Sequence, residues 1–150
     1  MKISVGMDHA GVPLRDAVIN YLKISGIEYI DHGTETKDSV DYPDYAELVA
    51  KDIQTGKADL GILMCSSGVG MSIAANKVPG VRAALVQSAD LAVLSRQHNN
   101  ANVLCMGAKY VSSDEAIGCV KAFLETPFEG GRHERRVCKI SKIEQEFDRS

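Results

Sequence analysis

Short apolar runs alternate with longer helical patterns along the chain, and this alternation limits the possible folds more than any other feature. Five apolar runs have the length of buried strands, and they cover residues 3–7, 27–30, 60–64, 81–86 and 103–106. Six other segments have helical character, at 13–23, 43–56, 70–77, 88–97, 112–125 and 132–146. Strands that alternate with helices form parallel sheets covered on both faces. The sequence therefore predicts an α/β fold with a doubly wound, five-stranded parallel sheet.

No linker or repeat divides the 150 residues, so we expect a single domain over residues 1–150. We predict the strand order 2-1-3-4-5, in which the winding reverses between the first and third strands. Such sheets bind ligands at this reversal, at the carboxyl ends of the strands. Asp8-His9 and Cys65–Gly70 directly follow these two strands, so the two clusters are expected to share one crevice.

The loop after the third strand combines a thiol with small residues. The residues that follow Cys65 are Ser66, Ser67, Gly68, Val69 and Gly70. Glycines let the backbone approach a ligand closely, and the first N–H groups of the next helix attract negative charge. The same helix end favours a thiolate over a thiol. The loop could hold an oxyanion and supply a base, but a buried structural cysteine explains it equally well.

Three familiar motifs are excluded at this loop. Gly68-Val-Gly70 is not continued as G-x-G-x-x-G, and the segment does not supply a G-x-x-x-x-G-K-[ST] phosphate loop. A thiol phosphatase of the C-x5-R type would need arginine at position 71, where this chain has Met71.

Three further polar clusters are candidates for chemistry, and each also has a structural explanation. Asp8 could orient a hydroxyl and His9 could hold an anion, or they could be a helix N-cap and a surface histidine. His98 could be a general acid or base and Asn99 an oxyanion donor, or both could end a solvated helix. Arg132 and Arg136 share one face of a helix start, where positive charge opposes the dipole, and could bind phosphate or form a solvated basic patch.

Composition excludes several other classes of function. The net charge of −3 provides no basic field for nucleic acid. The four cysteines include no C-x-x-C pair and match no zinc spacing, so we expect no metal site. The chain has no signal-peptide pattern and no apolar run long enough to span a membrane, so we expect a cytoplasmic protein. A small anionic substrate, an acid/base pair and an oxyanion cradle together suit proton abstraction beside a carbonyl, as in aldose–ketose isomerisation.

Six motifs in one order closely resemble the type B ribose-5-phosphate isomerases, in the wider family that includes galactose-6-phosphate isomerase subunits. The motifs are Gly6-Met-Asp-His-Ala-Gly11, Asp41-Tyr-Pro43, Cys65-Ser-Ser-Gly-Val-Gly70, Ile73-Ala-Ala-Asn-Lys77, Ser95-Arg-Gln-His-Asn99 and Gly130-Gly-Arg-His133. The match covers nearly the whole chain. The resemblance implies a doubly wound fold, no metal or cofactor, and a homodimer, or a dimer of dimers, whose sites lie between subunits and whose C-terminal helix serves dimerisation.

The resemblance also implies a role for each matching position. Cys65 would be the base that moves a proton between carbons 2 and 1, and His98, helped by Asp8, would open the sugar ring. A cis-enediolate would be stabilised by the backbone of Ser66, Gly68, Val69 and Gly70 with Ser67 and Asn99. The phosphate would be held by His9, Arg132 and Arg136, with the arginines donated by the partner, and Tyr42 would line the pocket.

Two departures from the family pattern affect these expectations. Ser67 stands where threonine is frequent, and the hydroxyl survives. Lys109 stands where arginine is frequent, which keeps the charge but loses the bidentate fork. Some members use a glutamate base at position 71 and lack the cysteine. Because this chain has Met71 and Cys65, we assign the base to Cys65.

The leading hypothesis is the interconversion of D-ribose 5-phosphate and D-ribulose 5-phosphate. The nearest alternative is an isomerase of a six-carbon sugar phosphate, such as allose 6-phosphate or galactose 6-phosphate, because the sequence does not show the depth of the pocket. A non-catalytic sugar-phosphate binding protein is a further alternative. A thiol-redox or phosphatase role is the weakest, given the missing C-x-x-C and the missing arginine at position 71.

Overall fold

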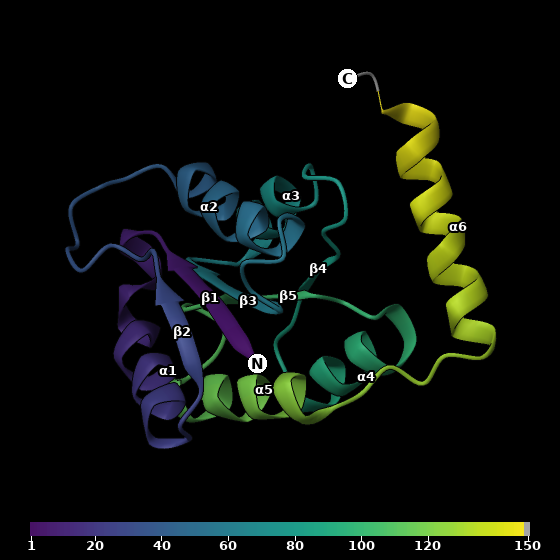
Figure 1. Cartoon of the computed structure of the whole chain (residues 1–150). Coiled ribbons are helices and arrows are strands. Elements are labelled where there is room, and N and C mark those ends of the chain that lie inside the picture. The colour runs from purple at the N-terminus through teal and green to yellow at the C-terminus, as the bar shows by residue number, and fades with distance from the viewer. Residues whose placement is uncertain (149–150) are drawn as a thin grey trace.

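A computed structural model describes residues 1–148 and confirms the alternating α/β pattern (Figure 1). The five strands are β1 (Lys2–Met7), β2 (Glu28–Asp31), β3 (Leu60–Cys65), β4 (Ala83–Leu85) and β5 (Val103–Gly107). The helices are α1 (Val12–Ile24), α2 (Tyr42–Gln54), α3 (Val69–Ala75), α4 (Ala89–Asn99), α5 (Ser113–Glu125) and α6 (Arg132–Phe147), and a short 3-10 turn spans His9–Gly11.

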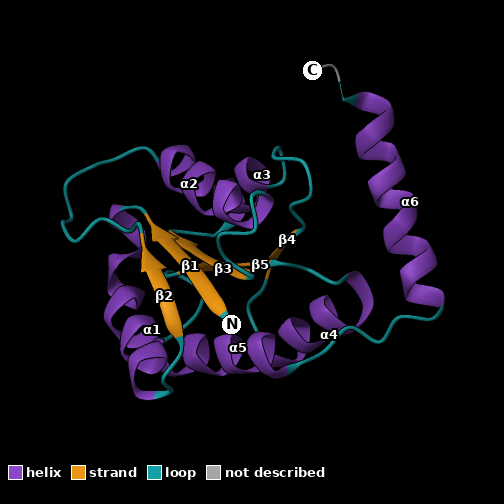
Figure 2. Ribbon diagram, viewed as in Figure 1, coloured by secondary structure: helices purple, strands orange, loops and turns teal. Residues whose placement is uncertain are grey.

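All strand pairs are parallel, and helices cover both faces of the sheet as predicted (Figure 2). Helices α1, α4 and α5 pack together on one face, while α2 and α3 pack together on the other. Strands β3 and β5 are buried along their whole length, so two aliphatic core layers form, one on each side of the sheet. This double burial explains why the two strands read as continuous apolar runs.

The predicted order of the last two strands is wrong: the sheet runs β2-β1-β3-β5-β4. Strand β5 pairs with both β3 and β4, and the three-residue β4 lies at the edge. A fully buried strand gains most in the centre, whereas a short half-buried strand suits an edge. The reversal also keeps the crossover right-handed with α4 on the face of α1 and α5. The winding reversal between β1 and β3 remains as predicted.

Local signals in the sequence fix several helix ends. The Ser88 hydroxyl accepts a hydrogen bond from the Leu91 N–H at 3.3 Å and begins α4. Ser112 and Glu115 form a reciprocal capping box at α5. Gly26 and Gly56 follow α1 and α2 with φ of 67° and 76°, where a side chain would be strained. These residues therefore set element boundaries independently of the tertiary packing.

Helix α6 extends away from the sheet, and the helix that it packs against is α4 (Figure 1). Its side chains at Ile140, Ile143 and Phe147 are 46%, 58% and 68% exposed. These residues recur on one side of the helix and border a hollow of about 860 Å³ beside β4. An apolar helix face of this kind is typical of an interaction surface.

No helix among residues 1–148 combines the length and the apolar character needed to cross a bilayer.

A buried carboxylate joins β1, α2 and the segment after β2. Asp52 is 7% exposed and accepts hydrogen bonds from the Ser4 hydroxyl at 2.8 Å and from His32 Nε2 at 2.7 Å. Burial raises the pKa of Asp52, but the bonds from His32 and Ser4 outweigh this effect and hold it below its usual range. The carboxylate is therefore a stabilising group only while it stays ionised.

This network predicts a pH-dependent loss of stability. The pKa of Asp52 is lower in the folded protein than in the unfolded chain. The contribution of Asp52 to the free energy of unfolding is therefore complete above its pKa in the unfolded chain, and it is lost as the pH falls through its pKa in the folded protein. Asp52→Asn is expected to lower the free energy of unfolding at pH 7 by about 1–3 kcal/mol. Urea unfolding between pH 7 and pH 3 should show a flatter profile for the variant than for wild type. Asp38→Asn, at an exposed position, is the matched control. If the free energy of unfolding of Asp52→Asn changed with pH as steeply as that of wild type, this account would be contradicted.

Candidate active site

The carboxyl ends of β1 and β3 are joined directly, as the winding reversal predicts. The Asp8 N–H donates to the Met64 carbonyl at 3.3 Å. A Cβ at Gly11 would lie 2.4 Å from the Met64 carbonyl oxygen, so only glycine allows the turn after β1 to approach β3 this closely. Asp8 and Cys65 therefore lie at neighbouring strand ends.

The loop after β3 turns back on its own thiol. Cys65 is 5% exposed, and its Sγ accepts a hydrogen bond from the Gly68 N–H at 3.1 Å. Gly68 has φ of 80°, and a Cβ there would lie 2.6 Å from Leu85 Cδ1. An N–H directed at sulfur stabilises a thiolate. The Ser67 hydroxyl likewise accepts from the Val69 N–H at 3.2 Å. Two N–H groups of the predicted oxyanion cradle are thus already bonded within the loop.

Strand β5 supports this loop and carries Lys109 to it. The Ala108 N–H donates to the Cys65 carbonyl at 2.8 Å, and the Lys109 N–H donates to the Ser66 carbonyl at 3.1 Å. A Cβ at Gly107 would lie 2.5 Å from the Ser67 carbonyl carbon. The loop after β5 therefore places the exposed Lys109 beside the Cys65 loop.

Asp8 and His9 both bond to backbone next to the crevice. Oδ1 of Asp8 accepts from the N–H groups of Ala10 and Gly11 at 2.9 and 3.1 Å, so Asp8 caps the 3-10 turn. Nδ1 of His9 accepts from the Val40 N–H at 3.1 Å. A neutral His9 therefore carries its proton on Nε2, where it can donate to an anion.

Tyr42 lies at the start of α2 and covers the start of α3. A Cβ at Gly70 would lie 2.6 Å from the Tyr42 ring, so the ring rests against the backbone at Gly70. Tyr42 is 41% exposed, and its ring lies against the loop that carries Cys65.

His98 and Asn99 lie near the amino ends of the strands, whereas Cys65 lies at the carboxyl ends. They form the last turn of α4, and the residues that follow enter the amino end of β5. The Asn102 carbonyl accepts from the Gly61 N–H at 2.8 Å, near the start of β3. Gly61 and Cys65 are four residues apart, or about 13 Å along a strand. One chain therefore does not bring His98 and Asn99 to Cys65.

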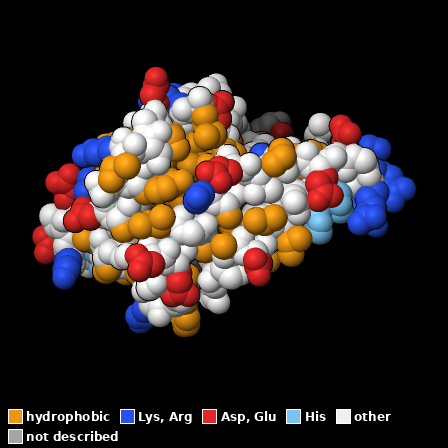
Figure 3. Space-filling model, turned by 90° about the horizontal axis from the view of Figure 1, so that it is seen from below, with side chains coloured by type: hydrophobic (Ala, Val, Ile, Leu, Met, Phe, Trp, Pro, Cys, Tyr) orange, Lys and Arg blue, Asp and Glu red, His pale blue; other side chains and the backbone are white. Residues whose placement is uncertain are grey.

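The second cluster joins α4 to α6. The rings of His98 and His133 stack with centroids 4.3 Å apart and planes 11° from parallel. His133 is 6% exposed, whereas Arg132 and Arg136 are exposed. Figure 3 shows histidine side chains beside basic side chains at the end of the molecule that carries α6. The site residues thus form two groups, one at each end of the sheet.

The charge state of the second cluster is set by burial and neighbouring cations. Burial lowers the pKa of His133, and the charges of His98 and Arg132 lower it further, while Glu129 opposes this effect. His133 is therefore neutral at neutral pH. Burial raises the pKa of Cys105 and also that of Cys119, which leaves both thiols protonated.

His98, Glu129 and His133 bring three potential metal ligands within 4.8 Å of one another. The lone pair of an imidazole nitrogen lies in the ring plane, and the two planes are nearly parallel and stacked. Lone pairs in such planes do not converge on one ion. The cluster as folded is therefore suited to ring stacking rather than to chelation.

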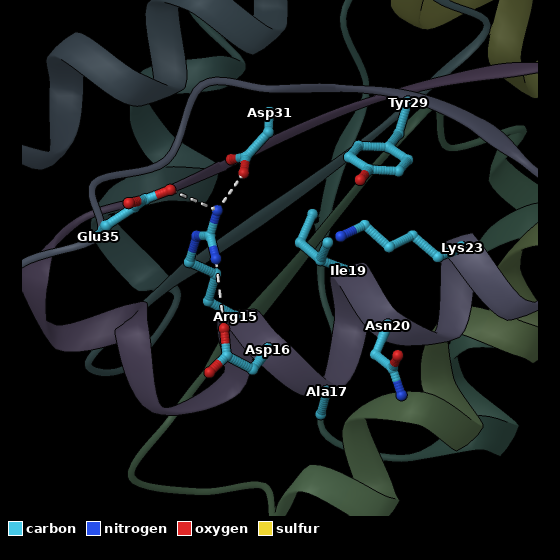
Figure 4. A pocket seen from close by; sticks show the side chains of 9 residues that line it. All are labelled: Arg15, Asp16, Ala17, Ile19, Asn20, Lys23, Tyr29, Asp31 and Glu35. Carbon is cyan, nitrogen blue, oxygen red and sulfur yellow. Dashed lines mark hydrogen bonds and ion pairs between the residues drawn. The ribbon is translucent and has the colours of Figure 1, made fainter.

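A further hollow of about 620 Å³ lies between α1 and β2 (Figure 4). Arg15 occupies it, and its guanidinium is bonded to Asp31, to Asp16 at 3.2 Å and to Glu35 at 3.2 Å. Three carboxylates neutralise the charge of this cation, so the hollow offers no net positive charge to a phosphate, although the buried Nε of Arg15 has no hydrogen-bond partner among the described residues.

His133 and the close-approach glycines Gly11 and Gly107 were not predicted as site residues. His133 and Val137 are one helical turn apart, and both are buried against α4, which was the available sequence signal for the buried face of α6. The glycines had no such signal, because their role depends on contacts between strands.

Known proteins are similar to nearly the whole chain in sequence and in fold. A family model described as Ribose/Galactose Isomerase matches residues 3–140. Ribose-5-phosphate isomerase B of Escherichia coli is 46% identical over 144 residues, covering 96% of this chain and 97% of that protein. A structure of ribose-5-phosphate isomerase B from Clostridium thermocellum superposes with a TM-score of 0.96 at 46% identity, covering 99% of this chain and 100% of the other.

A structure from Mycoplasma genitalium is similar as well and contains bound ribulose-5-phosphate. It has a TM-score of 0.92 and 46% identity, and the match covers 97% of each chain. The resemblance seen in the six sequence motifs is thereby confirmed over the full fold. The chain belongs to the ribose/galactose isomerase family.

Proposed function

We propose that this protein interconverts D-ribose 5-phosphate and D-ribulose 5-phosphate. The observation that carries the proposal is the Cys65 thiol at the β1/β3 crevice, with the Gly68 N–H directed at its sulfur and Asp8 at the adjacent strand end. A homologue with 46% identity and the same fold binds ribulose-5-phosphate, which supports this substrate class.

The chemistry is a transfer of hydrogen between adjacent carbons. The Cys65 thiolate removes the proton from C2 of the open-chain aldose, which leaves a cis-enediolate with its negative charge on O1. The proton on O2 then passes to O1, and the Cys65 thiol returns its proton to C1 as O2 becomes the ketone oxygen. Ser67 and the backbone N–H of Gly70, in the first turn of α3, are placed to stabilise the enediolate oxygens.

Phosphate binding requires several positive or N–H groups that face one point. From the same chain, the candidates are His9, whose Nδ1 is bonded to the Val40 N–H, and Lys109, whose backbone N–H is bonded to the Ser66 carbonyl. Arg132 and Arg136 lie at the other end of the molecule, on one exposed side of α6. They could reach a substrate at Cys65 only from a second copy of the chain.

The active unit is therefore proposed to be a homodimer with composite sites. His98, Asn99, Arg132 and Arg136 of one copy complete the Cys65 crevice of the other. The exposed apolar side chains of α6 and the hollow of about 860 Å³ beside β4 offer a surface that a second copy would cover. A cytoplasmic location fits this function, since the described cysteines are all free thiols.

The direct test is an assay of the purified full chain with five- and six-carbon aldose phosphates, with and without a metal chelator. Turnover of ribose 5-phosphate at the highest kcat/KM supports the proposal. A higher kcat/KM for allose or galactose 6-phosphate would assign a six-carbon substrate instead. Binding of these sugars without turnover would indicate a binding protein and contradict the proposal.

A further inference from the structure

We propose that His133 is a positioning residue for the ring-opening step, acting through the face of its ring on His98. The proposal rests on the proposed function, in which His98 opens the ring of the sugar phosphate. His133 itself needs no contact with substrate, because its contact is with the acid/base group.

The stack of His98 on His133 connects the end of α4 to the start of α6, and we expect it to restrict the movement of the His98 side chain. His98 lies in the last turn of α4, and helix ends are prone to fray. His133 lies in the first turn of α6, with its ring 4.3 Å from that of His98. The Glu129 N–H also donates to the Gln97 carbonyl at 3.2 Å, so the loop before α6 is fastened to the same turn of α4.

The ring of His133 is held from several directions. It is 6% exposed, its backbone N–H donates to the Gly130 carbonyl at 3.1 Å, and Nε2 lies 3.6 Å from a carboxylate oxygen of Glu129. Val137, one turn further along α6, is buried on the same side. A ring fixed in this way restricts the orientation of the ring stacked on it.

Charge also separates the roles of the two histidines. The groups that act on His133 are Glu129 in the loop, Arg132 and Arg136 on α6, and His98 on α4. Nearby Arg96 directs its Nε to the Thr126 carbonyl at 3.2 Å. Two stacked imidazolium rings repel each other, and burial beside arginines keeps His133 neutral. His133 therefore contributes an uncharged ring to the stack.

The decisive experiment compares His133→Ala with His133→Phe in both directions of the reaction. His133→Ala removes the ring and is expected to lower kcat on ribose 5-phosphate by about 10–100-fold with KM nearly unchanged. Ribulose 5-phosphate has no hydroxyl free to close a five-membered ring, so its conversion should fall by less than about threefold. His133→Phe keeps an uncharged ring and should restore the forward rate to within about threefold of wild type.

Arg135→Ala is the matched control, because it removes an exposed side chain from the same helical turn and leaves the stack in place. Thermal unfolding checks that each variant is folded. An unchanged forward kcat in His133→Ala, an equal loss in both directions, or a His133→Phe variant as slow as His133→Ala would each overturn the proposal.

An NMR measurement separates this proposal from the proposed function. Ring-current shielding from the stack should move the His98 Cε1–H resonance upfield in wild type and in His133→Phe, and the shift should be lost in His133→Ala. This readout needs no turnover. A wild-type protein without isomerase activity would defeat the proposed function, whereas an unchanged His98 resonance in His133→Ala would defeat the stack.

Discussion

Replacing Cys65 by alanine is expected to lower kcat for ribose 5-phosphate by at least about 10⁴-fold, with little change in substrate affinity. The thiol is the group at the crevice whose sulfur receives an N–H bond, whereas the neighbouring Cys105 is fully buried and burial raises the pKa of its thiol. Alanine removes the base and leaves the Gly68 N–H and the loop backbone in place. Cys65→Ser should be similarly inactive, because a serine hydroxyl is far less acidic than a thiol.

Steady-state assays in both directions and calorimetric binding of ribulose 5-phosphate measure the two parts of this expectation. Cys138→Ala is the matched control, because Cys138 is a free, exposed cysteine on α6 and its loss should leave turnover unchanged. Exchange of the C2 proton with deuterated solvent should also cease in Cys65→Ala. Turnover within about tenfold of wild type would show that another group is the base.

Replacing His98 by asparagine is expected to have a large effect that depends on the direction of the reaction. The variant should lower kcat on ribose 5-phosphate by about 10²–10⁴-fold, because the cyclic sugar has to be opened by acid/base catalysis. The acyclic ribulose 5-phosphate bypasses that step, and its conversion to the open-chain aldose should be affected much less. Asparagine retains a polar side chain but cannot transfer a proton near neutral pH.

The contrast with His9→Asn makes this result specific. His9 is proposed to bind the phosphate, which both sugars carry, so its loss should raise KM in both directions alike. Coupled spectrophotometric assays for the ketose and for the aldose provide the two rates. Equal losses in both directions for His98→Asn would contradict a role in ring opening.

Much of the fold follows from local sequence signals. The alternation of apolar runs and helical patterns gave the elements, and Ser88 and the Ser112–Glu115 capping box mark helix starts that the structure retains. The positions of β4 and β5 were not predictable in this way. Either strand order leaves the local patterns unchanged, and the choice depends on which strand buries both faces and on which side α4 packs.

The candidate site was predicted as a set of residues but not as a place. Asp8 follows β1 and Cys65 ends β3, so the topology places both at the carboxyl ends of the strands. His98 lies at the end of α4, which leads back to the amino ends of the strands. This position could have been inferred from the order of elements alone. The stack of His98 on His133 depends on how α6 leaves the sheet, which no local pattern determines.

The composite site is tested most directly by mixing two inactive variants, Cys65→Ala and His98→Asn, after partial unfolding and refolding together. In a twofold dimer with shared sites, each mixed dimer has one site with both residues intact, so random mixing should restore about a quarter of wild-type activity. Each variant refolded alone is the control. A mixture no more active on ribose 5-phosphate than the separate variants, although size-exclusion chromatography and mass spectrometry show mixed dimers, would contradict the composite site.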